Sequence, residues 1–152
     1  MKKLFLLLTA CLALTACGSG EKGQAADTAA VVATDNVEQK DYVEVLSFHS
    51  KYRCPTCIAI EKNTRELVDA KFGDALKSGD LVMRVVDISK DENKAIAEKY
   101  EVTWSSLLLV SHKDGKETVE NLTEFAFGNA RKAPDAFKAG IEEKIGNLLN
   151  QE

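Results

Sequence analysis

The amino-acid sequence predicts an α/β domain in which helices flank a mixed four-stranded sheet, in the chain order β-α-β-α-β-β-α. Three observations lead to this class. Two apolar runs are separated by a helical segment, which is the pattern of a parallel βαβ unit. The segment Lys113-Asp114-Gly115-Lys116 is a strong hairpin signal. The final helical segment repeats apolar residues at the spacing of one helix face.

The first half of the domain supplies the βαβ unit. Residues 43–48 form a short apolar run with partial alternation and are predicted to be a strand. A helix is expected to follow from Pro55, whose missing N–H is harmless in a first turn, to near Gly73. Residues 81–88 are nearly continuous in apolar and β-branched side chains, which suits a strand covered on both faces.

The second half completes the sheet and covers it. Ser89 and Glu92 have the spacing of a capping box and predict a short helix from that point. Residues 105–111 predict a buried strand, and the hairpin turn leads to a last strand within residues 117–127. A final helix is expected to begin near Pro134. Its apolar face consists of Phe137, Ile141, Ile145, Leu148 and Leu149.

The chain begins with the pattern of an export signal. Lys2 and Lys3 precede an apolar run over residues 4–16, which is too short for a permanent membrane span. The sequence Leu-Thr-Ala-Cys at 14–17 resembles a bacterial lipobox. The resemblance implies removal of residues 1–16 and a diacylglycerol on Cys17, and two or more acyl chains would hold the protein firmly to a membrane. An ordinary signal peptide cut nearby, or a short apolar anchor, remains open.

The remainder divides into a tether and one domain. Residues 17–40 are small and polar after the acylated cysteine and predict a flexible tether, and residues 41–152 are the predicted folded domain. The formal net charge of the 152-residue chain is −4, and removal of Lys2 and Lys3 with the signal changes it to −6. This mildly acidic balance argues against nucleic acid or an anionic membrane surface as a partner. The signal and lipobox patterns predict a lipid-anchored domain in the bacterial cell envelope, facing the periplasm or on the cell surface.

Cysteine usage directs attention to one pair. The chain has four cysteines, of which Cys11 lies in the predicted signal and Cys17 at the lipobox. Cys54 and Cys57 remain, with two residues between them. The predicted export would place them outside the cytoplasm, where disulfides persist. The spacing alone fits a redox-active disulfide, a metal clip or a structural staple. A metal site would need two more ligands, and His49 and His112 are the only histidines.

The cysteine pair is also the main point of likeness to a known family. On the sequence CPTC at 54–57, between a strand and a helix, and on KYEVTWSSLLLV at 99–110, residues 42–149 resemble the thioredoxin superfamily. The resemblance implies that Cys54 is the attacking, more exposed sulfur and Cys57 the resolving one. A helix N-terminus lowers a cysteine pKa from about 8.5 to about 3.5–7.5, and Lys51 and Arg53 add positive charge nearby.

The sequence departs from that family at two places. Ser105 stands where thioredoxin-like sites carry a cis-proline, and a cis bond before serine is costly, so the bond is expected to be trans. Trp104 precedes it, and the two residues are predicted to form the loop that faces the substrate. Ser47 stands where many thioredoxins bury an acid. Glu44 is on the same strand, and the sequence does not fix the face to which it points.

Two functions of different classes follow. The first is a lipid-anchored redox carrier that exchanges electrons with an envelope protein, such as a membrane thiol reductase. The lipobox, CPTC, VTWSSL (102–107) and TEFAFGNAR (123–131) also resemble thioredoxin-like accessory subunits of nitrophenyl reductase systems linked to organoarsenical resistance. No flavin or nucleotide fingerprint is present, so no cofactor is expected, and such a subunit would deliver electrons without reducing a nitro group itself.

The second function is a binding module. The same dithiol could hold copper(I), zinc or trivalent arsenic. The missing cis-proline favours this reading, because it leaves Cys54 more open. The absence of Met-rich stretches and of further cysteines weighs against it.

Overall fold

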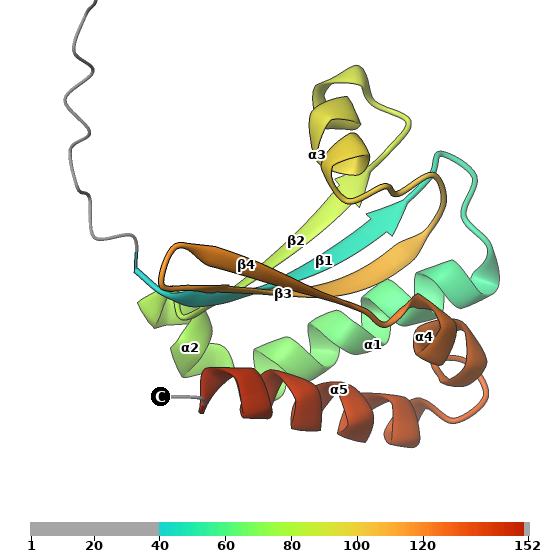
Figure 1. Cartoon of the computed structure of the whole chain (residues 1–152). Coiled ribbons are helices and arrows are strands. Elements are labelled where there is room, and N and C mark those ends of the chain that lie inside the picture. The colour runs from blue at the N-terminus through green and yellow to red at the C-terminus, as the bar shows by residue number, and fades with distance from the viewer. Residues whose placement is uncertain (1–39, 151–152) are drawn as a thin grey trace, which may run out of the picture. The chain divides into compact units, whose positions relative to one another are not determined.

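The structure is a computed structural model that describes residues 40–150, and it confirms the predicted class. A mixed four-stranded sheet has the order β2-β1-β3-β4, with helices on both faces (Figure 1). β1 pairs with β2 in parallel and with β3 antiparallel, and β3 pairs with β4 antiparallel. The strands are β1 (Tyr42–His49), β2 (Leu81–Asp87), β3 (Ser106–Lys113) and β4 (Lys116–Asn121).

The helices are divided between the two faces of the sheet. They are α1 (Pro55–Lys71), α2 (Gly73–Ser78), α3 (Lys94–Lys99), α4 (Thr123–Asn129) and α5 (Pro134–Leu149), with a short 3-10 turn, η1 (Asp91–Asn93), before α3. Side chains of α1, α4 and α5 share one core with the sheet, whereas α3 packs on the other face. Figure 1 shows α3 on one side of the strands and α1 with α5 on the other.

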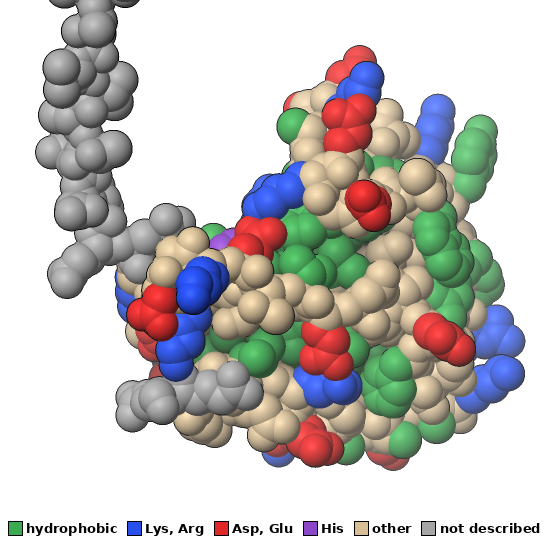
Figure 2. All heavy atoms as spheres, viewed as in Figure 1, with side chains coloured by type: hydrophobic (Ala, Val, Ile, Leu, Met, Phe, Trp, Pro, Cys, Tyr) green, Lys and Arg blue, Asp and Glu red, His purple; other side chains and the backbone are tan. Residues whose placement is uncertain are grey.

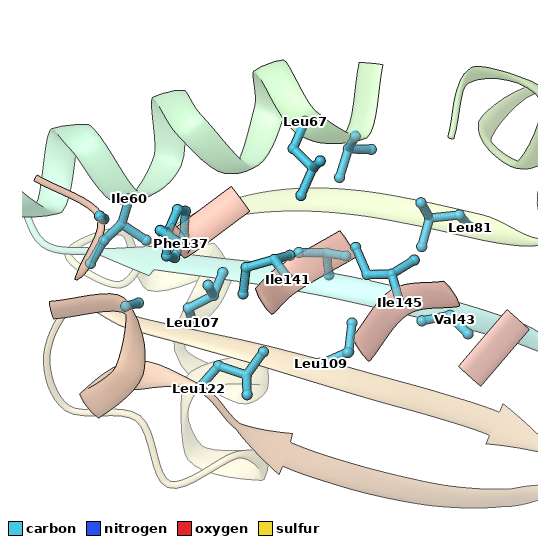
Figure 3. Close-up of a cluster of buried hydrophobic side chains, with 14 residues drawn as sticks. Val43, Ile60, Leu67, Leu81, Leu107, Leu109, Leu122, Phe137, Ile141 and Ile145 are labelled. Atoms are coloured by element: carbon cyan, nitrogen blue, oxygen red, sulfur yellow. The ribbon is translucent and has the colours of Figure 1, made fainter. Parts of the chain in front are cut away.

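The central strand β1 feeds both cores. Val43 and Val45 point into the larger core, and Leu46 and Phe48 point into the smaller one, as the two-residue period of a strand requires. The larger core receives Ile60, Leu67 and Val68 from α1 and Phe137, Ile141 and Ile145 from α5 (Figure 3). The last three recur every four residues, so the predicted apolar face of the final helix is confirmed at these positions.

The last strand is present, but the helix that follows it was not predicted. β4 ends at Asn121, and residues 123–129 form α4. The Asn121 Oδ1 accepts a hydrogen bond from the Thr123 N–H at 3.0 Å, and the Thr123 Oγ1 accepts one from the Leu107 N–H at 3.1 Å. These bonds turn the chain out of the sheet. All six residues of β4 are exposed, so the strand offers no alternation from which its end could be predicted.

The predicted capping box is also wrong. The Ser89 hydroxyl and N–H both bind the Asp87 carboxylate, at 2.7 and 3.0 Å, and these bonds lower the pKa of Asp87 below its usual value. Ser89 is therefore part of a turn after β2, and the chain passes through η1 before α3 begins at Lys94. The first helix ends at Lys71, close to the expected Gly73, but α2 follows it and was not predicted.

The predicted signal segment, the tether and Cys17 lie outside the described residues, except for Lys40 at the end of the tether. Within residues 40–150, every helix is too short or too polar to cross a bilayer.

Phe137→Ala tests the packing of α5 against the sheet. Phe137 is fully buried, so the truncation is expected to lower the free energy of unfolding by about 3–5 kcal/mol, measured by urea denaturation of the oxidised protein. Val119→Ala on exposed β4 is the control and is expected to change it by about 0.5 kcal/mol or less. Equal effects of the two substitutions would contradict the assignment of α5 to the core.

Candidate functional site

The cysteine pair lies at the junction between β1 and α1. β1 ends at His49, and after the four residues 50–53 Cys54 forms the N-cap of α1 in an extended conformation, with φ −75° and ψ 158°. Pro55 occupies the start of the helix, where no N–H is required, as the sequence predicted. The Cys54 Sγ accepts a hydrogen bond from the Cys57 N–H at 3.1 Å. A sulfur atom thus caps the helix, a place that serine or aspartate oxygens commonly fill.

The two sulfurs are bonded to each other. Cys54 and Cys57 form a disulfide with a Cα–Cα distance of 5.1 Å. Cys54 is exposed and Cys57 is half-buried. An incoming thiolate therefore reaches the Cys54 sulfur more readily. After reduction, the N–H of Cys57 and the positive end of the helix dipole would both stabilise a thiolate on Cys54.

Aromatic and apolar side chains surround this end of the molecule. Tyr52 precedes the pair and is 86% exposed, and Ile58 follows it on the helix. Trp104 is 57% exposed, and its ring lies 5.3 Å from that of Phe127 in α4. Figure 2 shows hydrophobic side chains gathered at the end where the β1–α1 connection and α4 lie. Trp104 is thus a surface residue and does not belong to either core.

The sheet register places the Trp104–Ser105 loop at the same end as the disulfide. Ser106 begins β3 and pairs with Phe48, next to the last residue of β1. Ser105 is buried, and the Ser106 Oγ donates a hydrogen bond to the Trp104 carbonyl at 3.1 Å. No peptide bond within residues 40–150 is cis, as expected for serine at position 105.

The Glu44 side chain points away from α1. Ser47 is buried and alternates with Val43 and Val45 toward the core that contains α1. Glu44 points to the opposite face, where its carboxylate contacts Arg84 at 3.0 Å and His112 at 3.5 Å. This buried acid therefore has a structural ion pair and does not lie beneath α1. Near the end of β1, the position that faces α1 is Ser47, which brings a hydroxyl group and no charge.

An ion pair beside the disulfide was not foreseen from the sequence. Arg53 contacts Glu61 through Nη2, and Arg65 contacts the other oxygen of Glu61 at 3.7 Å. The Arg53 and Glu61 side chains are 28% and 19% exposed, so the pair is partly desolvated. Glu61 lies four residues after Cys57, one helical turn away. That spacing is the signal that could have identified it.

Metal binding by the cysteine pair would need further ligands. Among residues 40–150, no three His, Cys, Asp or Glu side chains gather as a metal site. The His49 Nδ1 lies 3.0 Å from the Ser50 carbonyl oxygen, and His112 stacks on Tyr42, with ring centroids 4.1 Å apart, near the start of β1. Neither contact involves the cysteines.

Comparisons with known proteins give structural likenesses only. No protein-family model matches the chain, and neither does any curated protein sequence. A thioredoxin from Fasciola hepatica is 22% identical, with a TM-score of 0.46, over 73% of this chain and 85% of that one. An uncharacterised thioredoxin-like protein from Clostridium perfringens is 16% identical, with a TM-score of 0.46, over 73% and 75%. A Thermus thermophilus thioredoxin is 17% identical, with a TM-score of 0.44, over 70% and 73%.

The different exposure of the two sulfurs gives a direct prediction. In the reduced full chain with Cys11→Ser and Cys17→Ser, iodoacetamide near neutral pH is expected to modify Cys54 about tenfold faster than Cys57. The reason is the exposure of Cys54 and its place at the helix N-terminus. Peptide mass spectrometry after short exposures measures both rates. The same chain in 8 M urea, a condition that removes the fold, is the control and should show nearly equal rates; a faster Cys57 in the folded chain would contradict the assignment.

Proposed function

We propose that this domain exchanges thiols and disulfides through Cys54 and Cys57. One observation carries the proposal: an exposed sulfur caps the start of α1, is bonded to a partner sulfur one turn on, and accepts a hydrogen bond from that partner's N–H. A structural staple is usually buried and has no need of a position that stabilises a thiolate. The Cys57 N–H and the N-terminus of α1 face the Cys54 sulfur in the disulfide. The same two groups would stabilise the thiolate that forms on Cys54 when the disulfide opens.

The exchange proceeds in two balanced steps. A partner thiolate attacks the Cys54 Sγ, a mixed disulfide forms, and the Cys54–Cys57 bond breaks with its electron pair left on Cys57 as a thiolate. A second partner thiolate then attacks the partner's sulfur in the mixed disulfide and releases Cys54 as a thiolate. The partner is oxidised to a disulfide, and this chain gains two electrons. The reverse sequence passes the electrons on.

The surface around Cys54 is the proposed docking face for the partner. Tyr52, Ile58 and Trp104 are exposed apolar side chains, and Phe127 supports Trp104. Exposed large apolar groups gathered at one end commonly mark an interaction site. Trp104 and Ser105 are proposed to contact the partner segment that carries the reacting cysteine, since their loop and the disulfide occupy the same end of the sheet.

The partner is proposed to be an envelope redox protein, such as a membrane thiol reductase, because residues 1–17 carry the pattern predicted to be an export signal with a lipobox-like end. Lipid on Cys17 would keep the domain at the membrane surface, where it meets such a partner. The resemblance to accessory subunits of nitrophenyl reductase systems supports a more specific setting, in which the domain delivers electrons to a separate enzyme.

A cysteine substitution can trap the proposed intermediate. Cys57→Ser removes the resolving thiol, so the mixed disulfide between Cys54 and the partner is expected to accumulate. It would be detected on non-reducing gels of the envelope fraction as a higher-mass band that dithiothreitol abolishes. Cys54→Ser is the matched control and should give little of this band. A band of equal strength from both variants would contradict the assigned roles of the two sulfurs, and no band from either would contradict exchange with an envelope protein.

Cys17→Ser tests the membrane anchor. The substitution removes the proposed acylation site, so the protein is expected to lose metabolic labelling by palmitate and to leave the membrane fraction. Cys11→Ser, within the predicted signal, is the control and should retain both. Retention of the label and of membrane association by Cys17→Ser would overturn the lipid anchor without affecting the redox proposal.

A further inference from the structure

Cys54, Cys57 and Glu61 lie on one face of the helix. At 3.6 residues per turn, positions three and seven residues beyond Cys54 return to within about 60° of it. Glu61 is therefore the next side chain along the line on which the two sulfurs lie, and it belongs to the second turn of α1. Neighbours at this spacing have Cβ atoms about 5–6 Å apart, close enough for their charges to interact.

Arg53 brings a positive charge to the same face. It precedes the N-cap, yet its guanidinium contacts Glu61, which lies beyond both cysteines. The ion pair thus joins the residue before Cys54 to the helical turn after Cys57. The Arg53 Nε is buried and has no hydrogen-bond partner. A guanidinium held in this way is partly removed from water, so its field acts on the sulfurs with less screening than a surface charge has.

The sheet supplies no competing charge at this place. Ser47 occupies the buried β1 position that faces the α1 core, and the Glu44 carboxylate lies on the far face with Arg84 and His112. The ionised groups at the sulfur-bearing face of the helix are therefore Arg53 and Glu61, with the more exposed Arg65 on the second oxygen of Glu61 at 3.7 Å.

We propose that the Arg53–Glu61 ion pair sets the redox potential of the Cys54–Cys57 couple, as a pair of positioning residues that act on the sulfurs through their charges. This inference rests on the proposed function. Arg53 stabilises the thiolate that forms when the disulfide opens. Glu61 holds the guanidinium along the helix and offsets part of its charge, so the two residues act in opposite directions on the reduced form.

The opposite signs separate this role from a structural one. Glu61→Gln leaves the Arg53 charge uncompensated, so the reduced form gains stability and the couple becomes more oxidising. Arg53→Gln leaves the Glu61 charge beside the sulfurs, so the reduced form loses stability and the couple becomes more reducing. Each change is expected to alter the equilibrium constant with glutathione by about three- to tenfold, or about 15–30 mV at 29.6 mV per tenfold. A loss of packing alone would shift both variants in the same direction.

The chain offers two matched controls. Glu66 lies on the same helix, away from the sulfur-bearing face, where it pairs with Lys138 at 2.7 Å. Glu66→Gln removes an equal charge and should leave the equilibrium constant within about twofold of the parent value. Arg53→Lys keeps the charge and is expected to lie closer to the parent than Arg53→Gln does. If Arg53→Gln fails to fold, Glu61→Gln and its Glu66→Gln control carry the test.

The experiment is a redox equilibration of the full chain with Cys11→Ser and Cys17→Ser in detergent, in glutathione buffers, with free thiols alkylated at each ratio. The rate of Cys54 alkylation against pH is a second readout, and its midpoint should fall for Glu61→Gln and rise for Arg53→Gln. The inference is established if Glu61→Gln and Arg53→Gln shift the equilibrium constant in opposite directions and Glu66→Gln leaves it unchanged. If the parent pair opens and closes across the glutathione buffers but the two variants shift the constant in the same direction, or not at all, the inference is overturned. A parent pair that never opens overturns the proposed function itself.

Discussion

The burial of β1 between two cores is the constraint on which the rest of the structure depends. Six of its eight residues are buried, and it pairs with β2 on one side and β3 on the other. The strand therefore has little freedom to move, and its end near His49 is fixed. The larger core then holds α1 against the same strand through Ile60, Leu67 and Val68. The connection that carries Cys54 is short, and the packing of β1 and α1 holds both of its ends in place.

This packing makes the chemistry of the cysteines a consequence of the fold. The helix must begin just after the sheet ends, so its unpaired N–H groups point toward the connection and toward Cys54. The hydrogen bond from the Cys57 N–H to the Cys54 Sγ is the local expression of that geometry. The ionised groups near the pair come from Arg53 and Glu61 at the helix, while the sheet contributes Ser47. The electrostatic control of the pair thus lies in the helix and the connection before it.

The sequence was informative where one physical signal dominated. The apolar runs at β1, β2 and β3, the hairpin turn and the face of α5 each predicted an element that the structure contains. The helix at residues 123–129 was not predicted, because hydrogen bonds accepted by the Asn121 and Thr123 side chains turn the chain at a place where the hydrophobic pattern gives no boundary. The direction of Glu44 and the Arg53–Glu61 pair depend on tertiary packing, which periodicity alone does not encode.

The most direct test of the central claim is the redox state of the Cys54–Cys57 pair in living cells. Cells would be quenched with acid before, during and after a brief exposure to dithiothreitol, and free thiols would be labelled with a maleimide that increases the mass of the chain. The account predicts that both thiols become labelled during the exposure and that the disulfide re-forms after the reductant is removed. A pair that stays closed throughout would show that the disulfide is a structural staple. Thiols that accept the label only after a chelator is added would show that they hold a metal.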